Sequence, residues 1–300
     1  MKFSNLKNLI RPKKVTKAIF PVAGFGTRFL PATKAQPKEM LPVVDKPVIQ
    51  YLVEDAARAG IKDVIFVTGR GKRAIEDHFD FSFELDKTLV EKNKMDLVKT
   101  VRRIAELARF SYVRQSMPLG DGHAIACASH MVNDEPVLIV FGDTLYDAPL
   151  SPTQQVIDAY NKYQAPIIGL AQVARSEVSK FGVADVESME NGVYKIKNFV
   201  EKPTIDEAPS DLVAVGIYII TPRVLEVLSS MANGKSGEIR LADAFGLMLE
   251  AGENIYGLKL EGDWLDTGTK FGLLKANIAL GLKNEEIGGD LRSFLKDLKY

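Results

Sequence analysis

The chain repeats a pattern in which short apolar runs are followed by segments with helical spacing. Residues 17–23 form a mostly apolar segment that leads into a glycine-rich loop, which predicts a buried strand entering that loop. Residues 47–59 have the spacing of a helix and lead into an apolar run at 64–67. Further strands are predicted at 112–113 and 137–141. Strands that alternate with helices favour crossover units and a mostly parallel sheet covered on both faces.

The pattern changes at two places. Residues 81–108 are charged and helix-prone, with apolar positions at helical spacing, and are interpreted as a helical insertion. Beyond Pro166, shorter alternating segments at 182–186, 193–200 and 213–220 predict mixed or antiparallel strands on one side of the sheet. The expected fold class is α/β, with a mostly parallel but mixed central sheet flanked by helices and a small additional sheet region. Open sheets of this kind bind ligands at the carboxyl ends of their strands.

Composition limits the kinds of partner. The 300 residues, 46% of them hydrophobic, can bury a large core as one α/β domain or a domain with an appendage. Lys plus Arg (39) equals Asp plus Glu (39), which argues against a nucleic-acid or anionic-membrane binder. No apolar run approaches the roughly twenty residues that a bilayer requires. The first residues alternate lysines and asparagines with apolar positions, unlike a signal peptide, and are expected to be a frayed extension rather than a membrane anchor.

The cysteine and histidine content points to a reducing compartment. Cys127 is the only cysteine and there are three histidines, so neither a disulfide framework nor a spaced zinc set is predicted. We therefore expect a cytoplasmic protein.

The sharpest chemical feature is the string GFGTRFLPATKAQPKEMLPVVDKP at residues 24–47. Its glycines would let backbone N–H groups approach a phosphate chain, and Arg28 and Lys38 add positive charge. Phe29 stands where a dinucleotide fingerprint needs a third glycine, and the Gly-Lys-Ser/Thr of a Walker A loop is absent. A bare GxG is as consistent with a structural turn as with a phosphate site, but the whole string favours phosphate binding.

Together with later motifs, this loop resembles the sugar-phosphate nucleotidyltransferases, and within them the bacterial type of UTP–glucose-1-phosphate uridylyltransferase. The matching pieces extend from about Lys17 to about Leu282 and include VTGRGKRAIEDHFD, YVRQ, GHA, FGD, SKFGVADVE, VEKP, APSDLVAVGIYI and WLDTGTKFG. The resemblance implies a Rossmann-like nucleotidyltransferase fold and an Mg²⁺-dependent enzyme. Its implied substrates are UTP and glucose 1-phosphate, and its products are UDP-glucose and pyrophosphate.

The resemblance also implies a division of the chain. One nucleotidyltransferase domain at 17–285 would follow an N-terminal extension at 1–16 and precede a charged tail at 286–300. Within the domain we expect a nucleotide-binding part at about 17–165, a sugar-binding part at about 166–267 and a C-terminal helix at about 268–283. Members of the family often form dimers or tetramers, and this helix is a plausible contact.

The implied reaction needs charge rather than a protein nucleophile. The phosphate of the sugar 1-phosphate is already ionised and attacks the α-phosphorus in line, so catalysis comes from positioning and charge neutralisation. The resemblance assigns the catalytic cations to Arg28, Lys38 and Lys202, and the Mg²⁺ ligands to Asp143 and Asp266. Asp143 follows an apolar run and so emerges at a strand's carboxyl end, whereas the fold must bring Asp266 near. Taken singly, the first could be a turn or cap aspartate and the second a loop acceptor.

The nucleotide contacts are implied in the same way. Gln115 matches the glutamine that hydrogen-bonds the pyrimidine edge, because an amide can donate and accept together. Ala23 and Gly24 would supply backbone contacts to the base or ribose. Gly26 belongs to the phosphate loop, and Gly120 to the turn near the base.

The sugar contacts are implied by three later motifs. Glu201 in VEKP would accept hydroxyls from the hexose, beside the lysine that grips the sugar phosphate. Alone, such charges on a strand usually indicate solvation. Gly182 in FGV would let the backbone contact a sugar hydroxyl, and Val215 and Gly216 match the sugar-facing VG.

Three positions depart from the family pattern. Asp121 replaces a usual leucine in the turn after the glutamine, Thr144 follows the first metal-binding aspartate, and Thr267 stands where cysteine is frequent. They leave open a thymidylyltransferase or a transferase for another hexose 1-phosphate. A binding relative without activity should have lost its cations and carboxylates, and a glycosyltransferase would not need the phosphate loop, so both rank lower.

Overall fold

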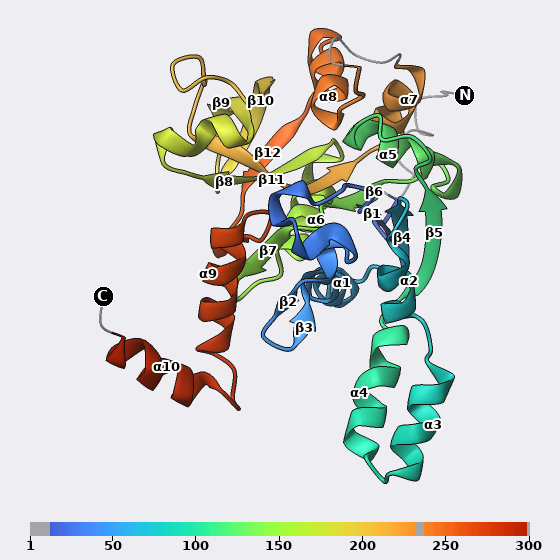
Figure 1. Ribbon diagram of the computed structural model, residues 1–300. Coiled ribbons are helices and arrows are strands. Elements are labelled where there is room, and N and C mark those ends of the chain that lie inside the picture. The colour runs from blue at the N-terminus through green and yellow to red at the C-terminus, as the bar shows by residue number, and fades with distance from the viewer. Residues whose placement is uncertain (1–12, 232–236, 299–300) are drawn as a thin grey trace, which may run out of the picture.

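A computed structural model describes residues 13–231 and 237–298. Within them, a sheet of nine strands has the order β5-β4-β1-β6-β11-β8-β12-β10-β9 (Figure 1). The strands are β1 Lys17–Pro21, β4 Asp63–Thr68, β5 Arg109–Arg114, β6 Val137–Val140, β8 Ile167–Gln172, β9 Gly182–Ser188, β10 Val193–Glu201, β11 Leu212–Ile220 and β12 Tyr256–Lys259. Most of the expected N-terminal extension, residues 1–12, lies outside the described residues.

The sheet is parallel in one half and largely antiparallel in the other. β1 pairs in parallel with β4 and β6, and β4 with β5, as crossover units require. β11 then runs antiparallel to β6 and β8, and β10 runs antiparallel to β9 and β12. The pairing of β8 with β12 is again parallel. The predicted α/β fold with a mixed sheet is confirmed, with its antiparallel strands on the later side of the chain.

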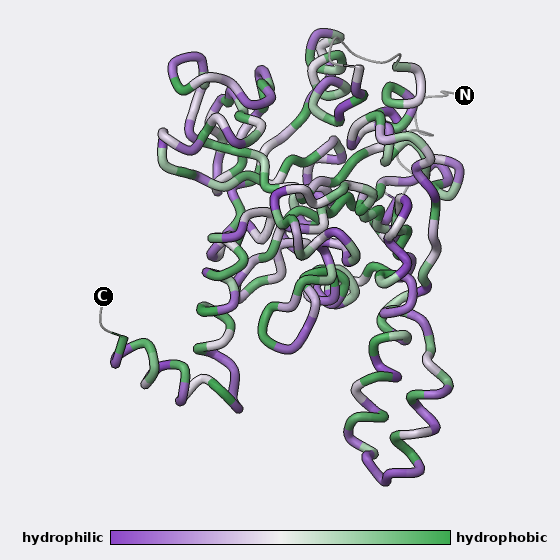
Figure 2. Tube along the Cα trace, viewed as in Figure 1, coloured by the Kyte–Doolittle hydropathy of each residue, from purple (hydrophilic) through white to green (hydrophobic). Residues whose placement is uncertain are grey.

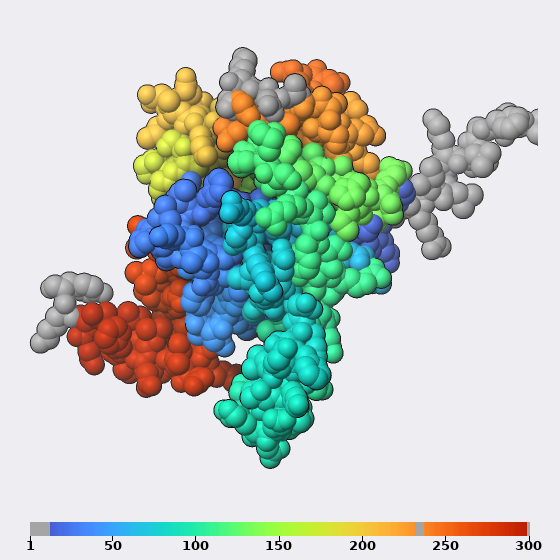
Figure 3. All heavy atoms as spheres, turned by 45° about the vertical axis from the view of Figure 1, so that its right-hand side comes forward, coloured from blue at the N-terminus to red at the C-terminus, as the bar shows by residue number. Residues whose placement is uncertain are grey.

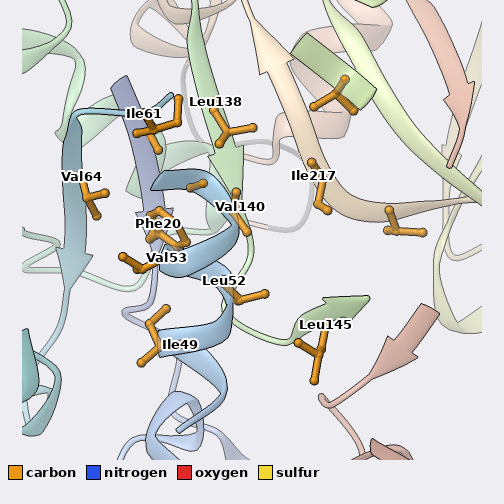
Figure 4. Close-up of a cluster of buried hydrophobic side chains, with 14 of the residues drawn as sticks. Phe20, Ile49, Leu52, Val53, Ile61, Val64, Leu138, Val140, Leu145 and Ile217 are labelled. Atoms are coloured by element: carbon orange, nitrogen blue, oxygen red, sulfur yellow. The ribbon is translucent and has the colours of Figure 1, made fainter. Parts of the chain in front are cut away.

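Helices bury both faces of this sheet. Successive residues of a strand point to opposite faces, so Phe20 packs into one apolar cluster and Ile19 into the other. The first cluster, part of which Figure 4 shows, contains side chains from four helices: α1 Val48–Arg58, α2 Arg73–Phe79, α6 Pro152–Tyr163 and α9 Lys270–Gly281. The second contains side chains from three: α5 Asp121–Cys127, α7 Pro222–Ser230 and α8 Leu241–Glu250. Burying each large apolar side chain contributes roughly 1.5–3 kcal/mol.

The charged insertion forms a helical hairpin that projects from the body, α3 Phe83–Glu91 and α4 Met95–Ala105 (Figures 1 and 3). Arg102 of α4 donates two hydrogen bonds to the carboxylate of Asp86 on α3, at 2.6 and 2.8 Å. Apolar and polar residues alternate along both helices in Figure 2, as expected of a pair that buries only one face. The predicted helical insertion is confirmed.

The C-terminal region corrects one prediction. The expected helix is α9, but the segment predicted as a charged tail contains a further helix, α10 Gly288–Asp297. Leu291 and Phe294 lie at helical spacing there, and Leu291 approaches Gly281 at the end of α9, so a short apolar stripe supports the helix.

Two small ladders lie outside the nine-stranded sheet, whereas the segments expected as strands at 182–186, 193–200 and 213–220 form β9, β10 and β11 within it. β2 Pro42–Val43 pairs with β3 Lys46–Pro47, and β7 Thr144–Asp147 pairs with β13 Asp263–Asp266. Over residues 13–231 and 237–298, the helices are all too short or too polar to cross a bilayer.

Candidate active site

The glycine-rich loop after β1 folds back on itself. Gly26 has a φ of 66°, a conformation that favours glycine, and the Thr33 hydroxyl donates to its carbonyl at 2.7 Å. A Cβ atom on Gly26 would lie 3.1 Å from the Cβ of Lys38. The loop's two arms therefore approach closely, which brings Arg28 and Lys38 to the same end of the sheet.

Two adjacent cavities open at this end. The first, of about 320 Å³, lies beside the glycine loop and is called the loop cavity; the second, of about 220 Å³, lies beside β9 to β11 and is called the strand cavity. Asp121, Phe141 and Asp143 line both. The boundary between the cavities is thus formed largely by two carboxylates and an aromatic ring.

The predicted site residues gather around these two cavities. Those in the loop cavity are Ala23, Gly24, Lys38, Gln115 and Gly120. Those in the strand cavity are Arg28, Gly182, Glu201, Lys202, Val215, Gly216 and Asp266. Gly26 lines neither, because its part is to turn the loop. Asp143 belongs to both.

An ion pair crosses the boundary. Lys38 Nζ lies 2.5 Å from Asp143 Oδ2, and both side chains are largely buried. Burial alone would raise the pKa of Asp143, but the charge and hydrogen bond of Lys38 outweigh it and hold that pKa below its usual value. Burial alone would lower the pKa of Lys38, and Asp143 and Glu39 reverse that effect. Both groups are therefore charged in the pair.

The β7–β13 ladder brings the second carboxylate beside the first. Asp266 is paired with Thr144, the residue after Asp143, so residues 123 positions apart in the chain become neighbours. A Cβ atom on Gly268 would lie 2.7 Å from Asp143 Oδ2 and 3.0 Å from Asp266 Oδ1. Burial, and less strongly the charge of Asp143, raise the pKa of Asp266. The carboxylates of Asp143 and Asp266 therefore lie next to each other at Gly268, whose N–H donates to Asp266 Oδ1 at 2.9 Å.

Thr267 holds the backbone at this junction. Its N–H and its hydroxyl both donate to the carbonyl of Asp143, at 3.0 and 2.9 Å. Thr144 is buried and its hydroxyl donates to the carbonyl of Val215. Thr144 therefore ties β7 to β11 and also lines the strand cavity, while Thr267 ties the end of β13 to the residue after β6.

Gln115 is anchored at the wall of the loop cavity. Its backbone N–H continues the β4–β5 ladder by donating to Thr68 at 2.9 Å, and its side-chain nitrogen donates to the Gly120 carbonyl at 2.9 Å. The ring nitrogen Nδ1 of His123 lies 3.0 Å from that same side-chain nitrogen. These contacts fix the amide beside the turn at Gly120, where its remaining acceptor can face the cavity.

Glycines make room in the strand cavity. A Cβ atom on Gly182 would lie 2.5 Å from the ring of Phe199 and 2.9 Å from Glu201 Oε2. Gly216 has a φ of 83°, and a Cβ there would lie 2.6 Å from the hydroxyl of Thr144. Lys202 follows β10 with a φ of 49°, and its Nζ lies 3.6 Å from Glu201 Oε1. The carboxylate and the ammonium group are thus presented side by side.

Several polar residues in or behind the cavity walls were not predicted from the sequence as site residues, Asp121, Glu39 and Lys72 among them. Asp121 lines both cavities, and Glu39 forms a buried ion pair with Lys72, with 2.8 Å between Oε2 and Nζ. A Cβ on Gly142 would lie 2.6 Å from Glu39 Cγ, so this pair lies directly behind the strand that presents Asp143. The carboxylate in the turn before His123 was a visible signal for the first residue. No local pattern links the other two.

Comparison with known proteins supplies the family. Residues 17–281 match the nucleotidyl transferase family. UTP–glucose-1-phosphate uridylyltransferase YngB of Bacillus subtilis (strain 168) is 44% identical over 286 residues, which cover 95% of this chain and 96% of that protein.

Two solved structures are also similar over most of the chain. UDP-glucose pyrophosphorylase complexed with UDP-glucose gives a TM-score of 0.82 at 42% identity, covering 90% of this chain and 100% of that one. A UTP-bound UGPase from Acinetobacter baumannii gives 0.88 at 36% identity, covering 95% and 100%. The family expected from the sequence is therefore confirmed, and the chain belongs to the nucleotidyl transferase family.

Proposed function

We propose that this protein transfers the uridylyl group of UTP to glucose 1-phosphate, which releases pyrophosphate and forms UDP-glucose. The observation that carries the proposal is the ion pair of Lys38 and Asp143 at the boundary of two cavities, where two phosphate-bearing substrates could meet. The relatives named for this reaction support the choice of substrates. No nucleophile is required, since the attacking phosphate is already ionised.

The two cavities divide the substrates between them. In the proposed arrangement UTP occupies the loop cavity, with its base near Gln115 and Gly120 and its phosphates beside the glycine loop. Glucose 1-phosphate occupies the strand cavity, with its hydroxyls facing Glu201 and the backbone at Gly182, Val215 and Gly216. The loop cavity is lined mainly by the part expected at about 17–165 to bind the nucleotide. The strand cavity is lined by the part expected at about 166–267 to bind the sugar, and also by Arg28, Asp121 and Asp143.

Cations neutralise the phosphates as they approach. Arg28 and Lys202 line the strand cavity and Lys38 lines the loop cavity, so positive charge is available on both sides of the boundary. Lys202 has 55% of its side chain accessible, so its ammonium group can reach a phosphate bound in the strand cavity. Charges fixed before the reaction stabilise a transition state without reorganisation.

The carboxylates of Asp143 and Asp266 suit Mg²⁺. The two carboxylates lie side by side at Gly268, and a hard cation that also binds substrate phosphates needs only one or two protein carboxylates. We propose that these two residues hold Mg²⁺. When bound, the ion would withdraw charge from the phosphate oxygens.

A pyrophosphate-release assay tests the proposed reaction. UTP, dTTP, CTP, ATP and GTP are each supplied with glucose 1-phosphate, and then with other hexose 1-phosphates, in the presence of Mg²⁺. We expect the highest kcat/KM for UTP with glucose 1-phosphate. A preference for dTTP would indicate a thymidylyltransferase, and release from no combination would indicate a binding protein.

Asp143→Asn tests the proposed metal ligand. Replacing this carboxylate should lower kcat by at least about 100-fold while the protein stays folded, because the metal-borne charge stabilisation is lost. The matched control is Asp158→Asn, an exposed aspartate on α6 that accepts a hydrogen bond only from Gln154 in the described structure. Near-normal turnover of the Asp143 variant at saturating Mg²⁺ would refute the assignment.

We also propose that the protein acts in the cytoplasm as a homodimer or homotetramer. A single cysteine suits a reducing compartment. Large apolar side chains are exposed on the last helices, namely Phe271 and Leu274 of α9 and Phe294 of α10. Such side chains are expected to be covered by a second copy of the chain.

A further inference from the structure

Asp121 has a defined position between the two cavities. It is the first residue of α5, and its Oδ1 accepts a hydrogen bond from the N–H of Leu241, the first residue of α8, at 2.8 Å. Since Arg240 provides no side-chain cap, the carboxylate of Asp121 caps α8 from a distant part of the chain. This bond fixes the direction of the carboxylate in the cavity wall.

The backbone around Asp121 is held equally firmly. The Ile239 N–H donates to the Leu119 carbonyl at 2.7 Å, and the His123 N–H donates to the Ile239 carbonyl at 3.3 Å. A Cβ atom on Gly122 would lie 2.8 Å from the backbone of Arg240. The turn and the segment before α8 therefore form one unit, and Asp121 cannot move away from the cavity without disturbing it.

Acceptor capacity of the carboxylate remains for a ligand. A carboxylate offers about four lone-pair positions. The backbone N–H groups of Leu241 and Gly122 approach Asp121, and the side chain also lines the strand cavity together with Glu201 and Tyr218. A group bound in this cavity thus meets one carboxylate on β10 and another on the opposite turn.

The two carboxylates in the wall of the strand cavity favour a ligand that donates hydrogen bonds. Burial, and after it the charge of Glu201, raise the pKa of Asp121, while Arg240 lowers it only weakly. The charges of Asp121 and Glu201 also raise the pKa of Tyr218 beneath them, after burial itself. A sugar hydroxyl that donates to either carboxylate would replace part of the lost hydration.

We propose that Asp121 is a specificity-determining residue that accepts a hydrogen bond from a hydroxyl of the bound hexose, different from the hydroxyl held by Glu201. The inference rests on the proposed function, because it assumes that the strand cavity takes the sugar 1-phosphate. It narrows the substrate class to hexose 1-phosphates that carry the hydroxyl bound by Asp121, and it excludes the analogues that lack this hydroxyl. A site built to pair a hydroxyl rejects an analogue that lacks it.

The test pairs variants of Asp121 with modified sugars. The kcat/KM values for glucose 1-phosphate and its 2-, 3-, 4- and 6-deoxy analogues are measured with UTP for the wild type, Asp121→Asn and Asp121→Leu. In the wild type, removing the hydroxyl that Asp121 binds should lower kcat/KM on the order of 10- to 100-fold. In Asp121→Leu, removing that one hydroxyl should no longer lower kcat/KM. Removing any other hydroxyl should still lower kcat/KM as it does in the wild type.

Two comparisons separate recognition from the cap on α8. Asp121→Asn keeps an oxygen that can accept from the N–H of Leu241 but removes the charge, so it should be at least as stable as the wild type and show a reduced penalty at the same hydroxyl. It also carries the test if Asp121→Leu does not fold. The control is Asp243→Asn, an exposed aspartate in the first turn of α8, which should leave every penalty unchanged.

The outcomes are distinct. An equal loss of kcat/KM for all sugars in both variants would mean that Asp121 only caps α8, and would overturn the inference while the proposed function stands. A wild type that releases no pyrophosphate from any sugar would overturn the proposed function and the inference with it. A loss of kcat/KM that disappears in the Asp121 variants for one deoxy sugar alone supports both the proposed function and the inference.

Discussion

At the scale of single residues, two ion pairs organise the charge of the site before any substrate binds. Lys38 and Glu39 are adjacent in a short 3-10 helix at Lys38–Met40, but they have different partners. Lys38 pairs with Asp143 at the cavity boundary, while Glu39 pairs with Lys72 beneath it. Because the inner pair packs against Gly142, it supports the backbone that presents the outer one.

Removing one partner of the inner pair should be costly. Glu39 is 1% and Lys72 is 5% exposed, so Lys72→Met leaves a buried carboxylate without its cation. We expect a loss of about 3 kcal/mol in the free energy of unfolding, measured by urea titration. The double variant Glu39→Gln with Lys72→Met has no unpaired charge and should recover at least half of that loss. If the double variant is less stable than Lys72→Met, the loss of stability does not arise from the unpaired charge of Glu39.

Asp121 should make stability depend on pH. Burial and the charge of Glu201 raise its pKa from 3.8 to about 6, so between these values the folded chain binds a proton that the unfolded chain has lost. The stability contributed by this group therefore falls as pH rises through this window and stays low above it. Asp121→Asn should be more stable than the wild type by roughly 1–3 kcal/mol at pH 7.5, and the difference should shrink toward pH 4.5.

Urea titrations of both proteins across this pH range measure that difference directly. Subtracting the two curves removes the titration of all other carboxylates. A difference that is constant with pH would show that the Asp121 carboxyl has an ordinary pKa in the folded protein.

Residues within one motif were predictable, and residues that meet only through the fold were less so. Arg28 and Lys38 belong to one loop, whose local turns place both near the same edge. Lys72 lies 33 positions from Glu39, in a different motif, and nothing in either stretch indicates that the two side chains pair inside the protein. Asp266 could be assigned only through the resemblance, since the β7–β13 ladder that brings it to Asp143 depends on tertiary structure.

At the scale of elements, the site depends on how turns dock on neighbouring segments. Gly120 precedes α5 with a φ of 105°, and a Cβ atom there would lie 2.3 Å from the carbonyl oxygen of Ile239. The close approach joins the turn that lines the loop cavity to the segment that leads into α8. A side chain at this position must push the two apart.

Two glycine-to-alanine substitutions separate this contact from general effects of glycine. Gly120→Ala combines an unfavourable φ with a backbone clash and should destabilise the protein by about 2 kcal/mol or more and raise the KM for UTP. Gly246→Ala, inside α8, meets nothing within 4 Å and should stabilise it by up to about 1 kcal/mol with an unchanged KM. Thermal unfolding and steady-state kinetics test both. Equal stability of the two variants would contradict the docking role.

Strongly apolar strands were the elements best predicted from the sequence. Residues 64–67 and 137–141 are continuous apolar runs, as expected where helices cover both faces. The helix α10 was missed because it opens with two glycines and is mostly polar, with few apolar positions to indicate a face. The helix packs against the end of α9, and the sequence of α10 alone gives no sign of this tertiary contact.

At the scale of the whole molecule, the two cavities lie where the parallel half of the sheet meets the antiparallel half. β6 carries the chain toward Asp143, and its antiparallel neighbour β11 carries Val215 and Gly216. Crevices of this kind, at the carboxyl ends of parallel strands, are the usual ligand sites of open sheets. The position of β11 between β6 and β8 could not be predicted from hydrophobic pattern alone, because several antiparallel orders bury the same residues.

The exposed ends of the last helices make a prediction about assembly. Leu274 of α9 is 58% exposed and Phe294 of α10 is 62% exposed, and neither lines the loop or the strand cavity. If a second copy covers them, the double variant Leu274→Asp with Phe294→Asp should convert the wild-type dimer or tetramer to monomer, since buried unpaired charge opposes association. Light scattering coupled to size exclusion measures the mass.

The matched control is Met189→Asp, at an exposed apolar residue after β9 and far in sequence from both helices. It should leave the mass of the wild type unchanged. Because an aspartate pair on α9 and α10 contacts neither cavity, pyrophosphate release by the monomer should stay within about threefold of the wild type if each subunit contains a complete site. A wild type that is already monomeric would refute the assembly. A monomeric variant that has lost activity would instead place part of the functional site at the interface between copies.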